Sequence, residues 1–519
     1  MDLFFERIFK NNLKTIAWLL VPAFILFIKS LGYEFTSMDE QWMVVKNVPF
    51  LKQWSSLKNA FVKPITDIYY RPFLMVSFII DYHLGQLSPF IYHLTNLILH
   101  LACVYLLFRF LLSCKVEKKI AFIFSLLFSL HPIVLHAVVW VPGRNDLLLC
   151  IFTLLSLIYL NKFIFTQSFK FFFFHLLFFC FALLTKENAI VLPSVFLMQY
   201  FVFREKKSNS IYLYGFIWIL IAGLFFVVRD KILSTPSIDS FSVHGLKNFV
   251  LAFVMCTGKV ILPFYQSILP IVKIPSVIVS LLGIGLVVFL VVKQGLINKK
   301  VALLGLFVFF IFLVIPIWFG AFKSGGEHYE HRSYTSLVGL MLFLSQIKFN
   351  THSKAFHNYL VAILCLFFIK SFARMPVYKN KQSFVDAGLK ERPDYYLFYL
   401  QKGEALYAKR EYRQSYDLFS KAIEIRPDKG DLYSNRGSAA YALGMYQEAV
   451  SDYTEAINKS TEFKMEYYLN RCIVYNKVGD SENATMDFLV LKKCCAERIP
   501  PNLDKTMMEK LNASKAEHK

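Results

Sequence analysis

Two adjacent carboxylates, Asp39 and Glu40, directly follow the first long apolar segment of the chain, Ile16 to Leu31. A carboxylate at hydrogen-bond distance from a hydroxyl group can take its proton while the oxygen attacks an electrophile. Acids placed where a chain leaves the bilayer contribute little to its insertion. The pair therefore has two interpretations, a solvated helix cap at the membrane surface or a general base.

Further candidate binding residues are spread over segments that lie far apart in the sequence. They are Arg71, His93, His131, Arg144, Asp146, Lys186, Glu187, His331, Arg332 and Tyr334. Taken alone, each has a structural explanation: Arg71 can anchor at the interface, and Lys186 with Glu187 can form an internal ion pair. Taken together, the bases suit an anionic lipid headgroup, because Arg binds phosphate through two nitrogens.

Two histidines and an aspartate, His131, His136 and Asp146, are close enough in sequence to suggest a metal site. A protein metal site needs at least three well-placed ligands, and no third clear ligand accompanies the histidines. We therefore expect no metal and no cofactor.

The composition indicates a polytopic membrane protein. The chain has 519 residues, of which 56% are hydrophobic and 55 are Phe, and its mean hydropathy is +0.47. Apolar windows of about 18–20 residues recur, as in membrane-spanning helices. The net charge of +21 needs no nucleic-acid partner. Most of the excess Lys and Arg lies in short loops between apolar segments, where it determines orientation.

The loop charges predict the orientation of the chain. Arg7, Lys10 and Lys14 place the N-terminus in the cytoplasm. The basic loops, expected on the same side, are 115–119, 162–170, 204–207, 293–300 and 348–357. The loops 131–146, 185–188, 229–244 and 323–332 then fall on the outer side with Asp39 and Glu40. Treating the polar-interrupted segment 249–264 as half-inserted rather than crossing gives about eleven spans and an exported C-terminal part.

The C-terminal part is polar and contains an internal repeat. Tyr399, Gly403 and Phe419 recur as Tyr433, Gly437 and Tyr453, an offset of 34 residues that is typical of tetratricopeptide repeats. A third, degenerate copy is one residue out of step. The chain is predicted to be all-α, with a membrane domain at 1–375, a linker at 376–393, about three repeats at 394–498 and a polar tail at 499–519.

The motif set resembles the transmembrane and tetratricopeptide-repeat protein O-mannosyltransferases, within the C-type glycosyltransferases. The residues that carry the resemblance are Asp39-Glu40, Tyr70-Arg71-Pro72, Tyr92-His93-x2-Asn96-x3-His100, His131-Pro132-x7-Trp140-x2-Gly143-Arg144, Lys186-Glu187 and the His331-Arg332-x-Tyr334 set. The resemblance implies transfer of a sugar, mannose or a similar hexose, from a polyisoprenyl phosphate to a Ser or Thr hydroxyl. It places the catalytic base at Asp39 or Glu40, and the donor phosphate near Arg144, Lys186 and Arg332.

We therefore expect a multi-pass glycosyltransferase of the bacterial inner membrane or the endoplasmic reticulum, acting on the non-cytoplasmic side. Its expected partners are a polyisoprenyl-phosphate sugar, a protein or glycan acceptor, the bilayer and a possible protein partner on the repeats. Two alternatives stay open. One is a lipid-linked oligosaccharide ligase or polymerase with a glycan acceptor, and the other is a membrane-anchored repeat scaffold without activity.

Overall fold

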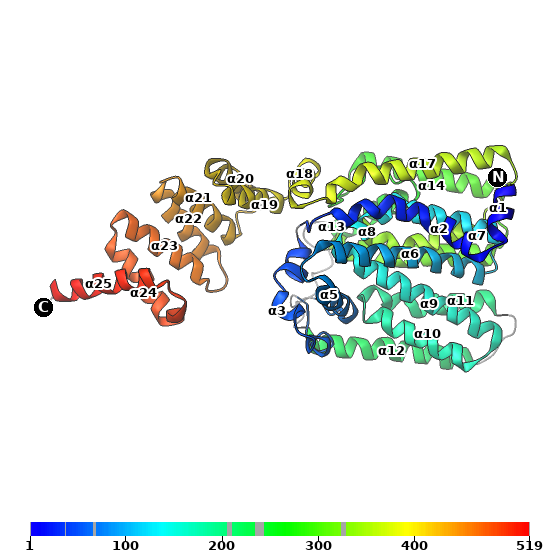
Figure 1. The fold of residues 1–519 in the computed structure, drawn as a ribbon, viewed down its shortest axis with the longest axis horizontal. Helices are drawn as coiled ribbons and strands as arrows, with labels where there is room; N and C mark the ends of the chain where they lie inside the picture. The colour runs from blue at the N-terminus through cyan, green and yellow to red at the C-terminus, as the bar shows by residue number, and fades with distance from the viewer. Residues whose placement is uncertain are drawn as a thin grey trace. The chain divides into compact units, whose positions relative to one another are not determined.

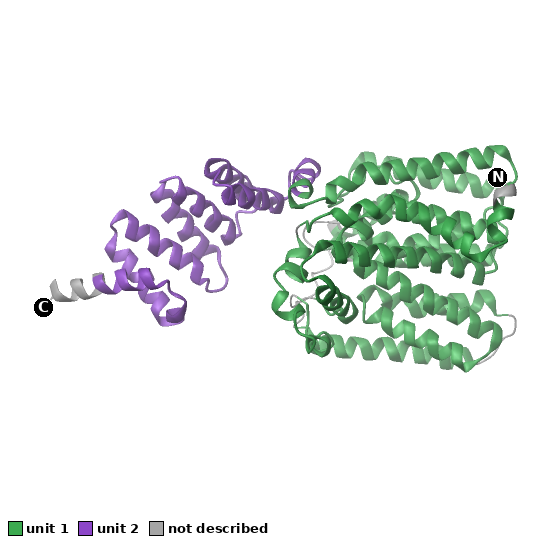
Figure 2. Ribbon diagram, in the orientation of Figure 1, with its two compact units in different colours: residues 1–384 green, residues 385–519 purple. Residues whose placement is uncertain are grey.

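The computed structural model describes residues 2–36, 38–65, 69–204, 210–233, 243–322 and 328–517. These residues form helices and loops without a strand, which confirms the all-α prediction for this part of the chain. Two isolated β-bridges join Ile65 to Tyr69 and Leu296 to Ile347. The chain divides into two compact units, Met1–Phe384 and Val385–Lys519, drawn green and purple in Figure 2.

Unit 1 is a bundle whose long helices run along one direction in Figure 1. Seven of its described helices are long and apolar enough to cross a membrane. They are α2 with η1 (Asn12–Gly32), α6 (Pro89–Ser113), η4 with α9 (Val141–Thr166), α12 (Ser210–Ile232), α14 (Ile274–Gln294), α15 (Lys299–Phe322) and α17 with η7 (Lys354–Tyr378).

The number of spans differs from the eleven predicted. An eighth is reached if α7 (Lys118–Leu130) and the following helical segment Pro132–Val139, bent from it by 48°, count as one span. Three more apolar helices are shorter than the about 20 residues that cross a bilayer without help. They are α5 (Pro72–Gly85), α10 (Phe169–Leu183) and η5 with α11 (Glu187–Phe203).

The remaining elements of unit 1 are short or lie outside this apolar group. They are α1 (Asp2–Phe9), η2 (Gln41–Val45), α3 (Val48–Leu51), α4 (Ser56–Asn59), η3 (Pro132–Val134), α8 (Leu135–Val139), α13 (Val243–Ile261), η6 (Glu330–Ser333) and α16 (Tyr334–Leu344). The segment 249–264, predicted to be half-inserted, belongs mostly to α13, which is not among the candidate spans. Of the predicted outer loops, 234–242 and 323–327 lie outside the described residues.

The predicted basic loops contact one another and the N-terminal segment. The contacts are Lys118 Nζ to Phe9 O at 3.2 Å, Lys119 Nζ to Thr351 O at 3.0 Å, Lys115 Nζ over the Phe165 ring at 4.9 Å, and Lys348 N to Gly295 O at 3.1 Å. Five segments that are far apart in sequence thus gather at one end of unit 1. The loop charges predict that these segments lie on the same side of the membrane, and the remaining basic loop, 204–207, lies mostly outside the described residues.

Two glycines let α15 and α16 approach closely. A Cβ atom on Gly305 would lie 2.5 Å from the backbone N of Phe343, and one on Gly339 would lie 2.3 Å from that of Phe309. Small residues at such crossings allow dense packing between membrane helices. The close contact fixes α16, and with it the short helix η6 that precedes it.

Unit 2 consists of helix pairs followed by one more helix. The pairs are α19 (Tyr396–Ala408) with α20 (Tyr412–Ile425), α21 (Gly430–Ala442) with α22 (Tyr446–Lys459), and α23 (Met465–Val478) with α24 (Ser481–Cys495). Helix α25 (Pro501–Glu517) follows η8 (Ala496–Arg498) and covers most of the range predicted as a polar tail. Gly403 lies against the Phe419 ring, so the pair α19–α20 has no room for a larger residue there.

The 34-residue spacing extends one helix further upstream than the sequence predicts. Helix α18 (Lys381–Glu391) ends 34 positions before α20, within the predicted linker 376–393. The turns after the two helices have the same sequence, Arg392-Pro393-Asp394 and Arg426-Pro427-Asp428. In each turn the guanidinium binds the carboxylate through two nitrogens, at 2.8 and 3.0 Å in the first and 2.7 and 2.7 Å in the second.

Candidate active site

Glu40 is fully enclosed and holds the loop that carries Asp39. Its Oε2 accepts hydrogen bonds from the backbone N–H of Thr36 and from the Thr36 hydroxyl, the latter at 2.8 Å. Its Oε1 accepts one from the N–H of Val141 at 3.1 Å. Burial raises the pKa of Glu40 to about 7 and outweighs these donors, which lower it. Both carboxylate oxygens are therefore occupied by the protein, and they tie the first loop to the start of η4.

Asp39 differs from its neighbour in burial and in hydrogen bonding. It is half-buried, and its carboxylate has no hydrogen bond or ion pair within the residues that the structure describes. Burial raises the pKa of its carboxyl group, while the charges of Arg71 and Arg332 lower it. Met38, just before it, has φ of 63°, a left-handed conformation that is costly for a residue with a side chain. Such strain often accompanies functional groups held in a defined direction.

Arg71 is held by Glu187 in a two-nitrogen ion pair. The distances are 2.5 Å from Nη2 to Oε1 and 3.1 Å from Nε to Oε2. The guanidinium also stacks on the Tyr69 ring at 4.2 Å. The backbone reinforces the link, because the N–H of Phe73 donates to Leu184 O at 3.3 Å. The N-terminus of α5 is thereby fixed to the start of η5.

Lys186 forms a second enclosed ion pair beside the first. Its Nζ lies 2.7 and 2.8 Å from the two carboxylate oxygens of Asp146 and 3.2 Å from Asn145 Oδ1. Burial lowers the pKa of Lys186, as do the charges of Arg71 and Arg332, while Asp146 raises it. All three ammonium protons thus have acceptors, and the residue joins the loop before η5 to the first turn of α9.

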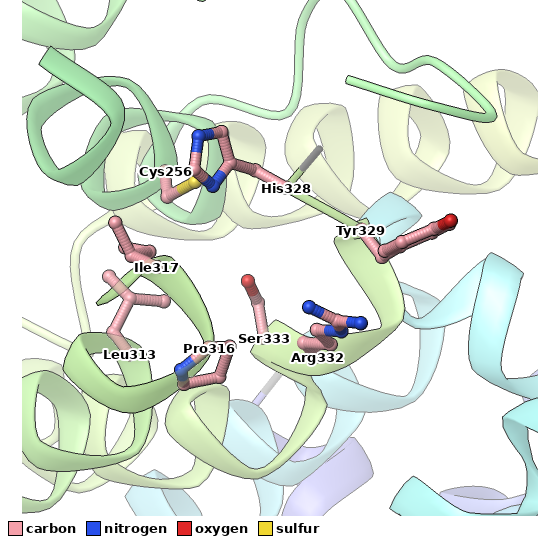
Figure 3. Close-up of a pocket in the computed structure, with 8 residues that line it drawn as sticks. All are labelled: Cys256, Leu313, Pro316, Ile317, His328, Tyr329, Arg332 and Ser333. Carbon is pink, nitrogen blue, oxygen red and sulfur yellow. The ribbon is translucent and has the colours of Figure 1, made fainter. Parts of the chain in front are cut away.

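Arg332 is the free cation of this group. It is half-buried, its side chain has no hydrogen bond or ion pair to any described residue, and its guanidinium lies 4.7 Å from the Tyr329 ring centroid. It borders a narrow hollow, whose cavity volume is about 10 Å³, together with His328 and Ser333. Figure 3 shows an apolar wall across the hollow, which consists of Leu313, Pro316 and Ile317. The hollow therefore combines a cation with a hydrocarbon surface.

Four charged residues influence one another electrostatically: Asp39, Arg71, Lys186 and Arg332. Arg71 and Arg332 both lower the pKa of Asp39, and both also lower the pKa of Lys186. Charges that are shielded from bulk water influence one another more strongly than charges in water do. The structure thus brings together residues that are up to about 290 positions apart in the sequence. In this group the two cations Arg71 and Lys186 are already neutralised, whereas Arg332 and Asp39 are not.

Arg144 is sealed inside the bundle instead of facing the hollow. Its Nη2 lies 2.5 Å from Asp81 Oδ2 and 2.9 Å from Tyr92 O. Its Nε donates to Asn96 Oδ1 at 2.8 Å, and its Nη1 donates to Ser77 Oγ at 3.2 Å. Each guanidinium nitrogen therefore has a protein acceptor. The side chain is fully enclosed, so it joins α5, α6 and α9 rather than offering donors to a ligand.

His331 lies next to the Lys186–Asp146 pair within a group of buried rings. Its Nε2 is 4.0 Å from Asp146 Oδ2, and its ring centroid is 4.6 Å from His136 and 5.2 Å from Trp140. Burial lowers the pKa of His331, and the surrounding positive charges lower it further. The ring is therefore neutral, and it packs as a polar aromatic residue beside the ion pair.

The other predicted residues are buried with local contacts. His131 caps η3, its Nδ1 accepting from Ile133 N at 3.2 Å, and its ring lies against Phe367. His93 lies edge-on to Tyr33 at 6.4 Å. The Tyr334 hydroxyl bonds to His100 Nδ1 at 2.7 Å, while His100 Nε2 faces Ser129 O at 3.1 Å. Tyr334 and His100 thus link α16 to α6 and α7.

Within the described ranges, no group of three or more His, Cys, Asp or Glu side chains could hold a metal ion. The sequence interpretation missed Asp81, the ion-pair partner of Arg144. A signal for it was present, because Asp81 lies near the end of an otherwise apolar helix, where a carboxylate usually has a specific partner. It also missed Asn145, the third acceptor for Lys186.

No family model matches the chain. Parts of it are similar to known proteins. Protein O-mannosyl-transferase TMTC1 of Homo sapiens is 30% identical over 145 residues, which are 26% of this chain and 16% of that protein. Protein O-mannosyl-transferase TMTC3 of Homo sapiens is 42% identical over 85 residues, 16% of this chain and 9% of that protein.

Protein O-mannosyl-transferase Tmtc1 of Drosophila melanogaster is 29% identical over 178 residues, 32% of this chain and 20% of that protein. The chain thus spans a fifth or less of the length of each of these relatives. The predicted resemblance is confirmed at this level: over part of its length, the chain is similar in sequence to protein O-mannosyl-transferases with the TMTC designation.

Proposed function

We propose that the chain is a membrane glycosyltransferase that moves a hexose, mannose in the first instance, from a polyisoprenyl phosphate to a protein Ser or Thr hydroxyl. Two independent lines support this proposal. Partial sequence similarity connects the chain to protein O-mannosyl-transferases. The observation that carries the chemistry is a pair of ionic side chains, Asp39 and Arg332, that have no partner among the described residues and interact electrostatically.

Asp39 is the base in this proposal, and Glu40 positions it. A general base needs a free oxygen within reach of the acceptor hydroxyl and a pKa close to the working pH. Asp39 has free oxygens, and burial raises its pKa. Glu40 cannot take a second role without releasing Thr36 and Val141.

Arg332 binds the donor phosphate in this proposal. Its guanidinium has donors available, and Arg matches the oxygens of a phosphate geometrically. The first isoprenoid units would lie along Leu313, Pro316 and Ile317, on the apolar side of the same hollow. Lys186 and Arg71 stay paired with their carboxylates and set the electrostatic potential around the phosphate. Arg144, Asp146, Glu187, His93, His131, His331 and Tyr334 serve as positioning residues.

The reaction is a single displacement with inversion at the anomeric carbon. The acceptor hydroxyl gives its proton to Asp39 as its oxygen forms a bond to that carbon. The bond between the carbon and the phosphate oxygen breaks, and its electron pair leaves with the lipid phosphate. Arg332 stabilises the charge that develops on this oxygen, and fixed charges in a water-poor site do so effectively.

The membrane arrangement that belongs to the proposal puts the basic end of unit 1 in the cytoplasm and the site on the other side. The N-terminus is then cytoplasmic, and unit 2 is exported as a tetratricopeptide-repeat domain. The helix pairs and the 34-residue spacing support the repeat assignment. About eleven crossings require α7, α10, α11 and α16 to cross as well, while α5 begins and ends on the outer side. The host membrane is the bacterial inner membrane or the endoplasmic reticulum.

The decisive experiment incubates the purified full-length protein with mannosyl and glucosyl polyisoprenyl phosphates and a Ser/Thr-rich peptide. Release of lipid phosphate together with a peptide mass increase of one hexose is the expected result. Asp39→Asn should abolish both the release of lipid phosphate and the peptide mass increase. Glu40→Gln, compared at the same concentration of folded protein, should retain part of the transfer rate. Full activity of Asp39→Asn would refute the assignment of the base.

A glycan acceptor in place of the peptide tests the alternative of an oligosaccharide ligase or polymerase. In that case the donor is consumed only when the glycan is present, and the peptide mass does not change. The scaffold alternative predicts no donor consumption under any condition, with function restored by unit 2 on an unrelated membrane anchor.

A further inference from the structure

A second pocket lies in unit 2, at the connection between α22 and α23. Its cavity volume is about 270 Å³, close to the lower end of the range of about 300–1,000 Å³ that is usual for small-molecule sites. The connection itself supplies most of the lining, with Ser460, Thr461, Glu462, Phe463 and Lys464, and α23 adds Tyr468. All of these residues belong to unit 2, so the pocket is a feature of that unit alone.

The pocket occurs where the repeat departs from its own pattern. Four residues, 426–429, connect α20 to α21, whereas five residues, 460–464, connect α22 to α23. The extra residue explains why the third helix pair is one position out of step. The Arg-Pro-Asp turn is also absent from the longer connection, which reads Ser-Thr-Glu-Phe-Lys. In a repetitive fold, a local departure from the rule commonly indicates a functional site.

An aromatic pair, exposed Phe463 and half-buried Tyr468, forms the apolar part of the pocket. Phe463 is 50% exposed, although it is a large hydrophobic residue in the polar unit of the chain. Its ring lies 5.2 Å from that of Tyr468 with an angle of 20° between the planes, so the two rings are stacked. The negatively polarised face of an aromatic ring attracts the weakly positive C–H groups of a sugar ring.

Polar groups around the pair are held in place. Lys464 Nζ lies 2.8 Å from Asp431 Oδ1, and the hydroxyl of Tyr467 donates to the same carboxylate. Ser460 Oγ donates to the backbone carbonyl of Glu462 at 2.6 Å, which closes the turn. The pocket thus offers an aromatic face beside fixed hydroxyl and ammonium groups and the carboxylate of Glu462. This combination suits a ligand with one apolar face and several hydroxyl groups.

We propose that this pocket binds a hexopyranose attached to a Ser or Thr of a polypeptide, that is, the glycosylated product of the reaction. The identity of the ligand rests on the proposed function, while the pocket, the aromatic stack and the inserted residue do not. A product site on unit 2 keeps a modified acceptor on the enzyme while further hydroxyl groups of the same polypeptide react. The local concentration of unmodified residues is then raised by tethering.

The test uses full-length protein in nanodiscs and saturation-transfer NMR, with methyl α-mannopyranoside, an O-mannosyl peptide and the same peptide without sugar. We expect saturation transfer to the mannoside and to the sugar protons of the glycopeptide. Phe463→Ala should weaken it about fivefold, the value of one aromatic contact. Tyr407→Ala is the matched control, since Tyr407 is 37% exposed and packs on Tyr412 away from this pocket.

Equal saturation transfer with Phe463→Ala and the unchanged protein would overturn the proposal, and so would equal binding of the peptide without sugar. Donor consumption is measured in parallel. Mannoside binding that depends on Phe463, in a protein that consumes no donor, would leave the pocket standing and refute the proposed reaction. Donor consumption without any mannoside binding that depends on Phe463 would support the proposed reaction and refute the proposed sugar site.

Discussion

Two arginines of unit 1, Arg144 and Arg332, occupy opposite kinds of environment. Arg144 is fully enclosed, and each of its nitrogens has an acceptor, including the carboxylate of Asp81. Arg332 is half-buried, and its guanidinium lies over the Tyr329 ring with no hydrogen bond to a described residue. Burying a charge without compensation is costly, and no described residue provides acceptors for the Arg332 side chain; in the proposed function the donor phosphate provides them.

The adjacent acids show the same contrast over a single peptide bond. Both carboxylate oxygens of Glu40 accept hydrogen bonds, from Thr36 and Val141, whereas the carboxylate oxygens of Asp39 have no partner in the described part of the chain. Residue type therefore says little about role at this site. The number of hydrogen-bond partners that the fold already provides separates the groups that build the site from those that face the substrate.

The largest expected effect tests the two acids against each other. Asp39→Asn removes the proton acceptor and should lower the transfer rate by about 10²–10⁴-fold, the usual contribution of general base catalysis. Glu40→Gln should cost less, because that side chain holds the loop. The rate per folded molecule, measured by peptide glycosylation, checks both. Equal losses in the two variants would remove the distinction.

The sealed arginine should matter for folding. Arg144→Gln leaves the Asp81 carboxylate buried without its counter-charge, and we expect a loss of about 3–5 kcal/mol in the free energy of unfolding. Denaturant unfolding in detergent provides the measurement. Arg332→Gln is the matched control and should stay within about 0.5 kcal/mol of the unchanged protein. A comparable loss in both variants would show that the two environments are energetically alike.

The half-buried arginine should matter for the donor. Arg332→Gln removes charge-assisted hydrogen bonds worth about 1.5–3 kcal/mol, so kcat/KM for the donor should fall about 10–150-fold. Arg332→Lys should restore part of this, since it keeps the charge but loses the planar two-nitrogen contact. Steady-state kinetics with varied donor concentration distinguish these outcomes. Unchanged kinetics in Arg332→Gln would mean that the phosphate binds elsewhere.

A smaller effect is expected at the support of Glu40. Thr36→Val deletes the hydroxyl that donates to Oε2 and should cost about 1 kcal/mol of unfolding free energy. Thr166→Val, which deletes an exposed hydroxyl bonded to Lys162 O, should cost only a few tenths of that. Parallel unfolding curves test the pair. Identical curves would argue against a structural role for the Glu40 contacts.

The subtlest effect concerns pH. Transfer requires deprotonated Asp39, so the rate should rise with pH through the pKa of that carboxyl group. Burial raises this pKa and the charge of Arg332 lowers it, so Arg332→Gln should move the rising limb of the pH–rate profile to higher pH. Profiles of kcat/KM for the two proteins provide the comparison. A rising limb that moves to lower pH would contradict the proposed proximity of Arg332 to Asp39.

The sequence predicts the helical class, the two-part organisation and the site region, because these follow from hydropathy, loop charge and spacing. It cannot assign the acids, because one donor to Glu40 comes from Val141, about a hundred positions away. It also places Arg144 with the phosphate, since the partner Asp81 becomes apparent only when α5 and α9 are packed together. The span count depends on helix length, which composition alone does not define.

Helix α18 changes where the repeat region can be cut or transplanted. Its Gly388 lies against Phe398 so closely that a Cβ would be 2.4 Å from the ring, and Phe398 is fully buried. A chain that starts at 394, the predicted first residue of the repeats, would leave that ring uncovered and forfeit about 1.5–3 kcal/mol. A chimera that carries these repeats to another membrane anchor should therefore join before Lys381, so that α18 travels with them as the terminal cap.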